Sequence, residues 1–355
     1  MVESVFERLP LGQMFMVGFD GCRLEEDHPL REVIERQRVG GVILFDRNVD
    51  GRRQNIRSPA QLKGLTASLH DLSPAPLLVA VDQEGGRVCR LKERDGFLPS
   101  CTAAELGRHE ADPHGPVLAM ARELREMGIN LNLAPVVDLD IYPENPIIGR
   151  HGRSFGADPD LVVAQARAFI QAHHRAGIAC ALKHFPGHGS SRGDTHLGFV
   201  DVTDTWQEKE LEPFARLIDH GLADCVMTAH VVNRQLDPDG LPATLSPPVL
   251  TGLLRQRLGF DGVIISDDLQ MGAISGQWSY REAVQRAVLA GVDLLIVGNN
   301  LIRQPDAVAE GILAIEELFD RGRLDVARIS RSLERIEKLK KNIQERVHGG
   351  KTGNP

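Results

Sequence analysis

The sequence predicts a single (β/α)8 barrel with extra helices at its C-terminal end, and two observations lead to that prediction. Eight short apolar runs, each ending in polar residues or glycine, recur along the 355-residue chain. Helix-length stretches with apolar residues at helical spacing lie between most of these runs. Eight alternating β and α units are what a (β/α)8 barrel requires, and the carboxyl ends of its strands carry the active site. An open, doubly wound sheet is the competing architecture, because it is built from the same units.

Each of the eight apolar runs has the length and the boundaries of a buried strand. We expect the strands, in chain order, at residues 14–18, 41–45, 77–82, 129–135, 179–185, 225–232, 262–267 and 294–298. The helices between them include residues 116–127, 160–176, 208–220, 247–258 and 280–290, and two amphipathic helices follow at 305–320 and 325–343. No long linker divides the chain, so we expect one catalytic domain at residues 1–345 and a disordered tail at residues 346–355.

One segment, residues 48–59, is an addition to a minimal barrel. It is polar and contains Arg52, Arg53 and Arg57. We expect a solvated surface loop, which is the usual role of such segments. A rim element beside the substrate is the alternative interpretation.

The composition indicates which partners and compartments suit the chain. A net charge of -8 argues against nucleic acid and against an anionic membrane surface as partners. The five cysteines are an odd set without C-x-x-C spacing, which predicts reduced thiols rather than a disulfide framework. The first 19 residues lack the basic and apolar segments of a signal peptide, and no run is apolar for long enough to span a bilayer. We expect a cytoplasmic protein, and we expect it to act as a monomer.

The richest concentration of titratable groups lies at residues 181–198, ALKHFPGHGSSRGDTHLG. An apolar run ends there in Lys183 and His184, and proline and glycine residues then open a loop. Asp194 and His196 lie two apart on that loop, so the carboxylate can hold one tautomer of the imidazole, as an acid/base histidine requires. This density of titratable groups predicts an enzyme.

Two adjacent carboxylates, Asp267 and Asp268, follow the apolar run of residues 262–266. A carboxylate beside a buried strand is unfavourable unless it is held by hydrogen bonds or used in chemistry. Adjacent side chains of a strand point to opposite faces, so only one of the two easily faces the barrel axis. We therefore expect one nucleophile and one structural partner. A carboxylate that caps the next helix is the alternative, and it suits Asp268 better than Asp267.

Two further loops combine charged side chains with glycine. Asp82, Glu84 and Arg90 follow the third predicted strand, and a carboxylate beside an arginine suits the recognition of sugar hydroxyls. An internal ion-pair network is an equally good interpretation. Glu84 is also a possible second carboxylate for glycoside hydrolysis. In the loop after the fourth strand, Arg153 is the better candidate for a ligand contact, and Arg150 is expected to be a surface charge.

Four histidines near predicted strand ends raise the question of a metal site: His184, His188, His196 and His230. Imidazole is a common metal ligand, but these spacings match no established zinc motif. We expect no metal and no cofactor.

Four segments resemble the β-N-acetylhexosaminidase branch of glycoside hydrolase family 3, the group of bacterial cytoplasmic β-N-acetylglucosaminidases. They are KHFPGHG at 183–189 followed by Asp194-Thr195-His196, LLRQRLGFDGVIISD at 253–267, VDQEGGRV at 81–88 and GRSF at 152–155. The resemblance runs from about residue 11 to about residue 340. It implies a single (β/α)8 barrel that removes terminal β-linked N-acetylglucosamine with retention of configuration.

The resemblance also implies a role for individual residues. Asp267 would be the nucleophile, and His196, oriented by Asp194, would be the acid/base. The N-acetylglucosamine ring and its acetamido group would be bound by Asp82, Arg90, Arg153, Lys183 and His184. The implied natural substrate is a peptidoglycan fragment, N-acetylglucosamine linked to 1,6-anhydro-N-acetylmuramic acid, during cell-wall recycling.

Three alternatives to this activity stay open. Some family-3 relatives with a histidine acid/base transfer the sugar to phosphate, so a phosphorylase is possible. The Asp267–Asp268 pair also resembles the paired acids of substrate-assisted hexosaminidases, in which the acetamido group of the substrate attacks. The third alternative is a barrel that binds sugar without turning it over.

Overall fold

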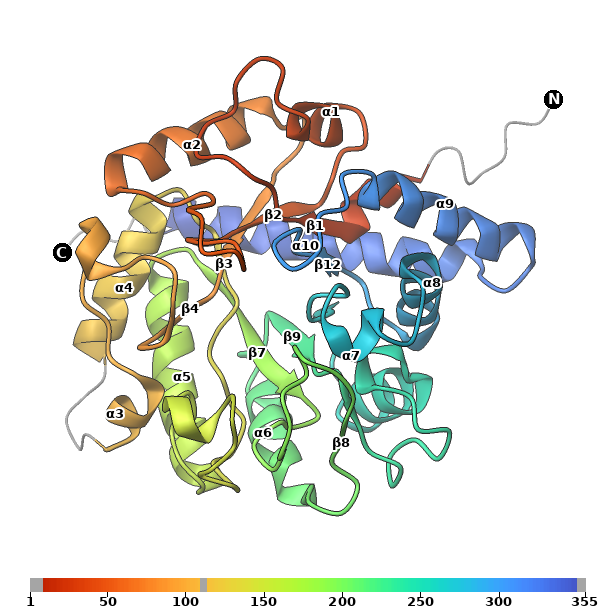
Figure 1. Ribbon diagram of the computed structural model, residues 1–355. Helices are drawn as coiled ribbons and strands as arrows, with labels where there is room; N and C mark the ends of the chain where they lie inside the picture. The colour runs from red at the N-terminus through yellow and green to blue at the C-terminus, as the bar shows by residue number, and fades with distance from the viewer. Residues whose placement is uncertain (1–8, 109–113, 350–355) are drawn as a thin grey trace.

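The central feature of the computed structural model, which describes residues 9–108 and 114–349, is a barrel of eight parallel strands (Figure 1). The strands are hydrogen-bonded in the order β11-β9-β7-β6-β3-β2-β1-β12. A parallel bridge between Ile265 and Leu294 joins the two outer strands of this order and closes the barrel. The eight strands are β1 Phe15–Val17, β2 Gly41–Leu44, β3 Leu78–Val81, β6 Leu131–Asn132, β7 Ala179–Phe185, β9 Cys225–Thr228, β11 Val263–Ile265 and β12 Leu295–Val297.

Every barrel strand is buried along its whole length. Parallel strands that are covered on both faces are apolar throughout, which explains why these strands are uninterrupted apolar runs in the sequence. Each of the eight predicted runs therefore contains a barrel strand, and the predicted (β/α)8 fold is confirmed. The run at 225–232 divides, because its second part forms β10 (Val231–Val232), which pairs with β8 (Val200–Asp201) outside the barrel.

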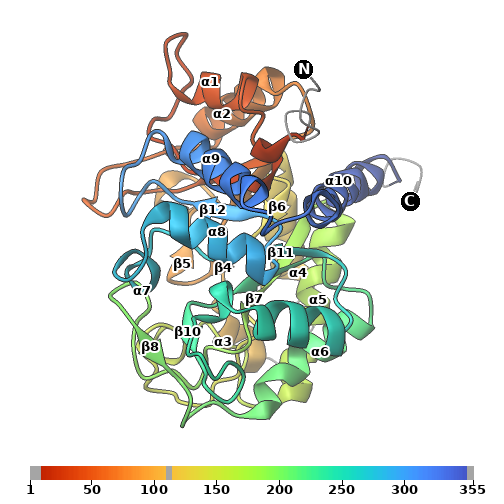
Figure 2. The ribbon, with the colours of Figure 1, turned by 90° about the vertical axis from the view of Figure 1, so that its right-hand side faces the viewer.

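Helices surround the strands, as Figures 1 and 2 show. They are α1 Leu30–Glu35, α2 Pro59–Leu72, α3 Ala103–Arg108, α4 His114–Glu126, α5 Pro159–Arg175, α6 Glu212–Asp219, α7 Gly272–Ser275, α8 Tyr280–Ala290, α9 Ala307–Asp320 and α10 Val326–Gly349. A π-helix, Pro248–Arg257, occupies the predicted helix at 247–258. Several helices begin at residues that satisfy their first N–H groups: Ser58 and Ser279 accept hydrogen bonds at the starts of α2 and α8.

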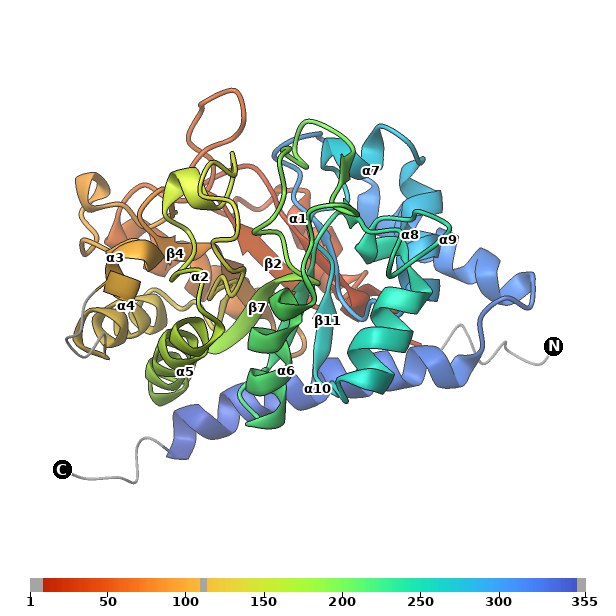
Figure 3. The ribbon, with the colours of Figure 1, turned by 90° about the horizontal axis from the view of Figure 1, so that it is seen from below.

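The longest helix, α10, lies across the barrel on the side away from α7 and its neighbouring loops (Figure 3). Polar side chains fix it there. The Lys340 ammonium donates to the side chain of Gln13, and Arg335 pairs with Asp261. The opposite face, where the strands end, is thereby left to the loops that carry the predicted site.

The expected boundary between the last helix and the C-terminal tail was wrong. Helix α10 continues to Gly349 rather than ending before residue 346, because Arg346 binds the buried carboxylate of Asp224 and Val347 packs on Gly177. Residues 350–355 of the expected tail lie outside the described residues. Within the described ranges, none of the helices has both the length and the apolar character needed to cross a membrane.

The insert at residues 48–59 is also not the plain solvated loop that we expected. Its tip is exposed, with Val49 64% accessible, but Gln54, Asn55 and Ile56 are buried. The Asn55 amide donates to the backbone carbonyl of Phe19, and its carbonyl oxygen accepts the N–H of the residue that follows β2. These bonds anchor the base of the insert to the barrel.

Candidate active site

The carboxyl ends of the barrel strands enclose a cavity of about 180 Å³. Seven of the eight predicted site residues line it: Asp82, Arg90, Arg153, Lys183, His184, His196 and Asp267. The eighth, Asp194, is hydrogen-bonded to His196 at the rim. The structure therefore brings into one place residues that are up to 185 positions apart in the chain, from Asp82 to Asp267.

A larger cavity, of about 530 Å³, lies under α10 beside the amino ends of β3 and β6. It is lined by side chains such as Lys63, Arg125 and Lys340. Among the described residues that line it, no histidine forms an ion pair with a carboxylate, and no two carboxylates come from neighbouring strands. The smaller cavity is therefore the candidate active site, since chemistry rather than volume decides between them.

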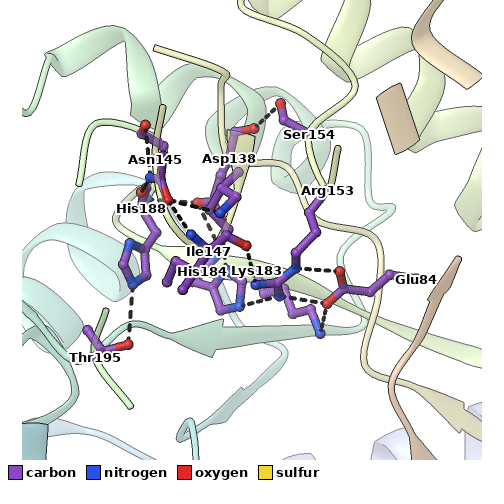
Figure 4. A network of polar contacts seen from close by, with 12 residues as sticks. Glu84, Asp138, Asn145, Ile147, Arg153, Ser154, Lys183, His184, His188 and Thr195 are labelled. Atoms are coloured by element: carbon purple, nitrogen blue, oxygen red, sulfur yellow. Dashed lines mark hydrogen bonds and ion pairs between the residues drawn. The ribbon is translucent and has the colours of Figure 1, made fainter. Parts of the chain in front are cut away.

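Lys183 lines this cavity and lies beside Glu84 and Arg153 (Figure 4). Its Nζ lies 2.8 Å from Oδ1 of Asp82 and 2.6 Å from Oε1 of Glu84. Arg153 binds Glu84 through both carboxylate oxygens, at 2.7 and 2.8 Å. Burial raises the pKa values of Asp82 and Glu84, but Lys183, Arg90 and Arg153 outweigh it, so the pKa of Asp82 falls well below its usual value and that of Glu84 falls to about 2.

The hairpin of β4 (Gln83–Gly85) and β5 (Val88–Cys89) positions two of these residues. The side-chain oxygen of Gln83 accepts the backbone N–H of Arg90, which fixes the far arm of the hairpin. Glycine is required at the turn, because Gly85 has a φ of 103° and an added Cβ would lie 2.0 Å from the carbonyl oxygen of Cys101. Arg90 then reaches back to Asp82, with Nη2 3.3 Å from Oδ2. The segment is thus both an ion-pair network and a wall of the cavity.

The sequence interpretation missed Asp138, which is fully buried and holds His184. Its Oδ2 lies 2.7 Å from Nδ1 of His184, and its Oδ1 accepts the backbone N–H groups of His184 and His188. A carboxylate can only accept here, so Nδ1 of His184 carries a hydrogen. Nε2 therefore faces Arg153, whose Nη2 lies 3.4 Å away and donates. The hydrogen on Nδ1 of His184 is thus directed at Asp138, and Nε2 faces the guanidinium of Arg153. The signal in the sequence was a carboxylate within the apolar stretch VVDLD at 136–140.

The predicted acid/base pair lies on the loop after β7. Nδ1 of His196 is 2.7 Å from Oδ1 of Asp194, and the same oxygen accepts the backbone N–H of His196 at 2.9 Å. The His196 side chain is 51% exposed, so its Nε2 is free to meet a substrate. The loop is attached to the start of α7, since Gly272 and Ala273 donate their N–H groups to the carbonyls of His196 and Thr195. This attachment places His196 beside the turn that follows β11.

That turn contains the two predicted carboxylates. Oδ1 of Asp267 accepts the backbone N–H of Asp268 at 2.8 Å. Burial raises the pKa of Asp267, but His230, His184 and His196 outweigh it, and the pKa lies below its usual value. Asp267 is therefore an ionised carboxylate at neutral pH, as a nucleophile must be.

Asp268 differs from Asp267 in its hydrogen-bond partners and in the direction of its pKa shift. Its Oδ1 accepts the backbone N–H groups of Gln270 and Gly298, which joins the turn to the end of β12. It does not cap a helix, because α7 begins only at Gly272. Burial raises its pKa to about 6. Asp268 is therefore bonded within the fold, and the reactive role of Asp267 stays a prediction.

The remaining candidates separate clearly. Arg150 is exposed and pairs with Glu144 across the surface, which is the surface charge that we expected. His188 is buried against Thr195, with Nε2 3.4 Å from Oγ1. In the described part of the chain, no group of three or more His, Cys, Asp or Glu side chains is arranged to hold a metal ion.

The chain was compared with known proteins. The model of the glycosyl hydrolase family 3 N-terminal domain matches residues 8–339. A beta-hexosaminidase of Tolumonas auensis is 39% identical over 290 residues, which are 80% of this chain and 82% of that protein. A beta-hexosaminidase of Hydrogenovibrio crunogenus is 38% identical over 342 residues, which are 93% of this chain and 89% of that protein.

Solved structures agree with these matches. The beta-N-acetylhexosaminidase of Beutenbergia cavernae superposes with a TM-score of 0.81 at 34% identity, over 96% of this chain and 100% of that chain. A glycoside hydrolase family 3 beta-N-acetylglucosaminidase from Paenibacillus superposes with a TM-score of 0.84 at 35% identity, over 98% of this chain. The present chain spans 63% of that longer protein.

Proposed function

Because this chain belongs to glycosyl hydrolase family 3 and is a glycoside hydrolase, we propose that it is a retaining exo-β-N-acetylglucosaminidase. One observation carries the proposal. An ionised carboxylate, Asp267, and a histidine paired with a carboxylate, His196, line the same cavity at the ends of the barrel strands. A retaining glycosidase needs a nucleophile and a proton donor on opposite sides of one glycosidic bond, and this cavity supplies both.

The two residues divide the reaction into two displacements. In the first, a carboxylate oxygen of Asp267 bonds to the anomeric carbon while the bond to the leaving oxygen breaks. The protonated Nε2 of His196 gives its proton to that oxygen, so the aglycone leaves as an alcohol. In the second, neutral His196 takes a proton from water, the water oxygen bonds to the anomeric carbon, and the carboxylate of Asp267 is released. Asp194 stabilises the imidazolium that donates in the first step and that forms again in the second, and it keeps Nε2 directed toward the bond.

The charged wall opposite Asp267 would hold the sugar. In this proposal Asp82, Arg90, Arg153, Lys183 and His184 bind the ring hydroxyls and the acetamido group of N-acetylglucosamine. Glu84 has a different part. Both of its oxygens are already bonded to Arg153, and one of them also to Lys183, so it orients these two cations rather than contacting the sugar.

We further propose that the natural substrate is a peptidoglycan fragment, N-acetylglucosamine linked to 1,6-anhydro-N-acetylmuramic acid, which the enzyme hydrolyses in the cytoplasm during cell-wall recycling. The five cysteines are all unpaired, which supports a reducing compartment. We also propose that the enzyme acts as a monomer.

The test is the initial rate of p-nitrophenol release from the β-N-acetylglucosaminide and from the β-glucoside. Faster release from the acetamido sugar is expected, and preference for the glucoside would contradict the proposal. The muropeptide disaccharide and N,N′-diacetylchitobiose are then compared as natural substrates, and faster hydrolysis of the first is expected. Repeating the assay with added phosphate separates hydrolysis from phosphorolysis, since a sugar 1-phosphate forms only in the second.

A further inference from the structure

Three buried polar side chains lie directly behind the turn that carries Asp267. Thr228 is the last residue of β9, and His230 lies two residues further along the chain. Thr244 belongs to the short 3₁₀ helix at Ala243–Leu245. All three are at most 1% exposed. None of the roles proposed above uses them, yet polar groups this deeply buried are stable only when their hydrogen bonds are satisfied.

Their hydrogen bonds link the turn to itself. The backbone N–H of Asp267 lies 3.4 Å from Oγ1 of Thr228, which lies 2.7 Å from Oγ1 of Thr244. That hydroxyl lies 2.7 Å from Nδ1 of His230, and Nε2 of the same ring lies 2.9 Å from the backbone carbonyl of Asp268. The path thus starts at one residue of the turn and ends at the next.

The donors and acceptors along this path have one consistent assignment when His230 is neutral. The Asp268 carbonyl only accepts, so Nε2 of His230 carries the hydrogen and Nδ1 is an acceptor. Thr244 then donates its single hydroxyl hydrogen to Nδ1 and accepts from Thr228, which in turn accepts from the N–H of Asp267. Four hydrogen bonds therefore run in one direction. Burial lowers the pKa of His230, which favours this neutral state.

A second acceptor keeps Thr244 satisfied if the ring is protonated. The carbonyl of Ala229 lies 3.0 Å from Oγ1 of Thr244. When Nδ1 of His230 carries a hydrogen and donates, the Thr244 hydroxyl can turn to this carbonyl while it still accepts from its neighbours. The Thr244 oxygen is thus the junction of the path in both charge states.

We propose that Thr228, Thr244 and His230 form a positioning relay that fixes the Asp267–Asp268 turn and so aims the nucleophile at the anomeric carbon. This inference rests on the proposed glycosidase function. The side chains of the relay hydrogen-bond to the turn after β11 and to the carbonyl of Ala229. Of the sugar-binding side chains, Asp82 follows β3 and Lys183 belongs to β7. Loss of the relay is therefore expected to slow the chemical step and to leave sugar binding almost unchanged, because small displacements of a reacting group reduce rates strongly.

The experiment compares Thr244→Val, which keeps the shape of the side chain but removes the junction, with Thr244→Ser, which restores the hydroxyl. We expect kcat on p-nitrophenyl β-N-acetylglucosaminide to fall about 10- to 100-fold in the valine variant with KM within about twofold, and the serine variant to recover most of the rate. Thr228→Val should behave like Thr244→Val, and it gives a second route to the answer because valine suits a strand. Thr66→Val is the matched control, since Thr66 is buried in α2 and lines the larger cavity under α10 rather than the candidate active site, so this variant should lose little activity.

Unfolding midpoints are measured for all variants. A kcat that is unchanged in both Thr244→Val and Thr228→Val overturns the relay. So does a loss that serine does not restore, or a loss of equal size in Thr66→Val. If the wild-type protein releases no p-nitrophenol, the proposed function fails and this inference fails with it, whereas wild-type turnover with insensitive variants refutes the relay alone.

Discussion

Arg153 binds Glu84 through two parallel hydrogen bonds, with Nε 2.7 Å from Oε2 and Nη2 2.8 Å from Oε1. Oε1 also lies 2.6 Å from Nζ of Lys183, so one buried carboxylate orients two cations of the cavity wall. Removing the charge of Glu84 leaves a buried arginine and a buried lysine with less compensation than they need.

We therefore expect Glu84→Gln to raise KM for the acetamido sugar by at least about tenfold and to lower the free energy of unfolding by about 3 kcal/mol. Glu144→Gln is the control, because Glu144 makes the same kind of pair with Arg150 on the surface. The control should change stability by less than about 1 kcal/mol. Kinetics and denaturant unfolding of both variants check this. A tolerated Glu84→Gln would show that the orientation of the two cations does not depend on the carboxylate.

The His196–Asp194 pair predicts a dependence on the leaving group. His196→Ala should slow hydrolysis of disaccharides by about 10² to 10⁴-fold, because their alkoxide leaving groups need a proton. Activated aryl glycosides should lose much less in the first step. Asp194→Asn should give the same pattern with a smaller amplitude. Equal losses on both kinds of substrate would remove His196 from the role of general acid.

Asp138 predicts a tautomer effect on His184. In Asp138→Asn an amide donor can replace Oδ2, so Nδ1 of His184 must accept and its hydrogen moves to Nε2, where it meets the N–H of Arg153. We expect kcat/KM to fall about 10²-fold with little loss of folded protein. Asp140→Asn, two residues along the same segment, is the control and should stay near wild type. Similar rates for the two variants would contradict the assignment of the tautomer.

Glu210 predicts a pH dependence of stability. It is buried against Gly187 in the acid/base loop, and its Oε2 has no hydrogen-bond partner within the described structure. Burial raises its pKa from 4.5 to about 7. The folded state then binds more protons than the unfolded state between those values, so this group's contribution to stability decreases as pH rises through that window and is constant above it.

Glu210→Gln removes this dependence. Relative to wild type, the variant should gain about 2–3 kcal/mol in the free energy of unfolding between pH 5 and pH 8. Glu208→Gln is the control. Because the Glu208 side chain is exposed, this variant should show no such difference between the two pH values. Denaturant titrations of the three proteins at both pH values provide the measurement. A difference that does not change with pH would place the pKa of Glu210 near its usual value.

The sequence was sufficient for the barrel and for much of the site. The strands are apolar runs because both of their faces are covered, and residues at the ends of such runs converge in a barrel. Of the site residues that it missed, Asp138 lies in an irregular segment after the short strand β6, and Thr244 lies in a short 3₁₀ helix. Neither segment has a periodicity that marks them. The contact of Lys183 with Asp82 joins residues 101 positions apart, and a local sequence pattern does not predict which distant residues form a pair. The insert at 48–59 was predicted to be a solvated loop because its charged residues dominate the pattern, and nothing in that pattern marks Asn55 as buried.

The most direct test of the mechanism is to identify the residue that becomes covalently attached to the sugar. The protein is treated with a 2-deoxy-2-fluoro glycosyl donor that carries an activated leaving group, digested, and analysed by peptide mass spectrometry. We predict one added glycosyl unit on the peptide that contains Asp267, and none in Asp267→Ala. Attachment to a different carboxylate, or tight inhibition by an oxazoline mimic without any attachment, would contradict a covalent intermediate on Asp267.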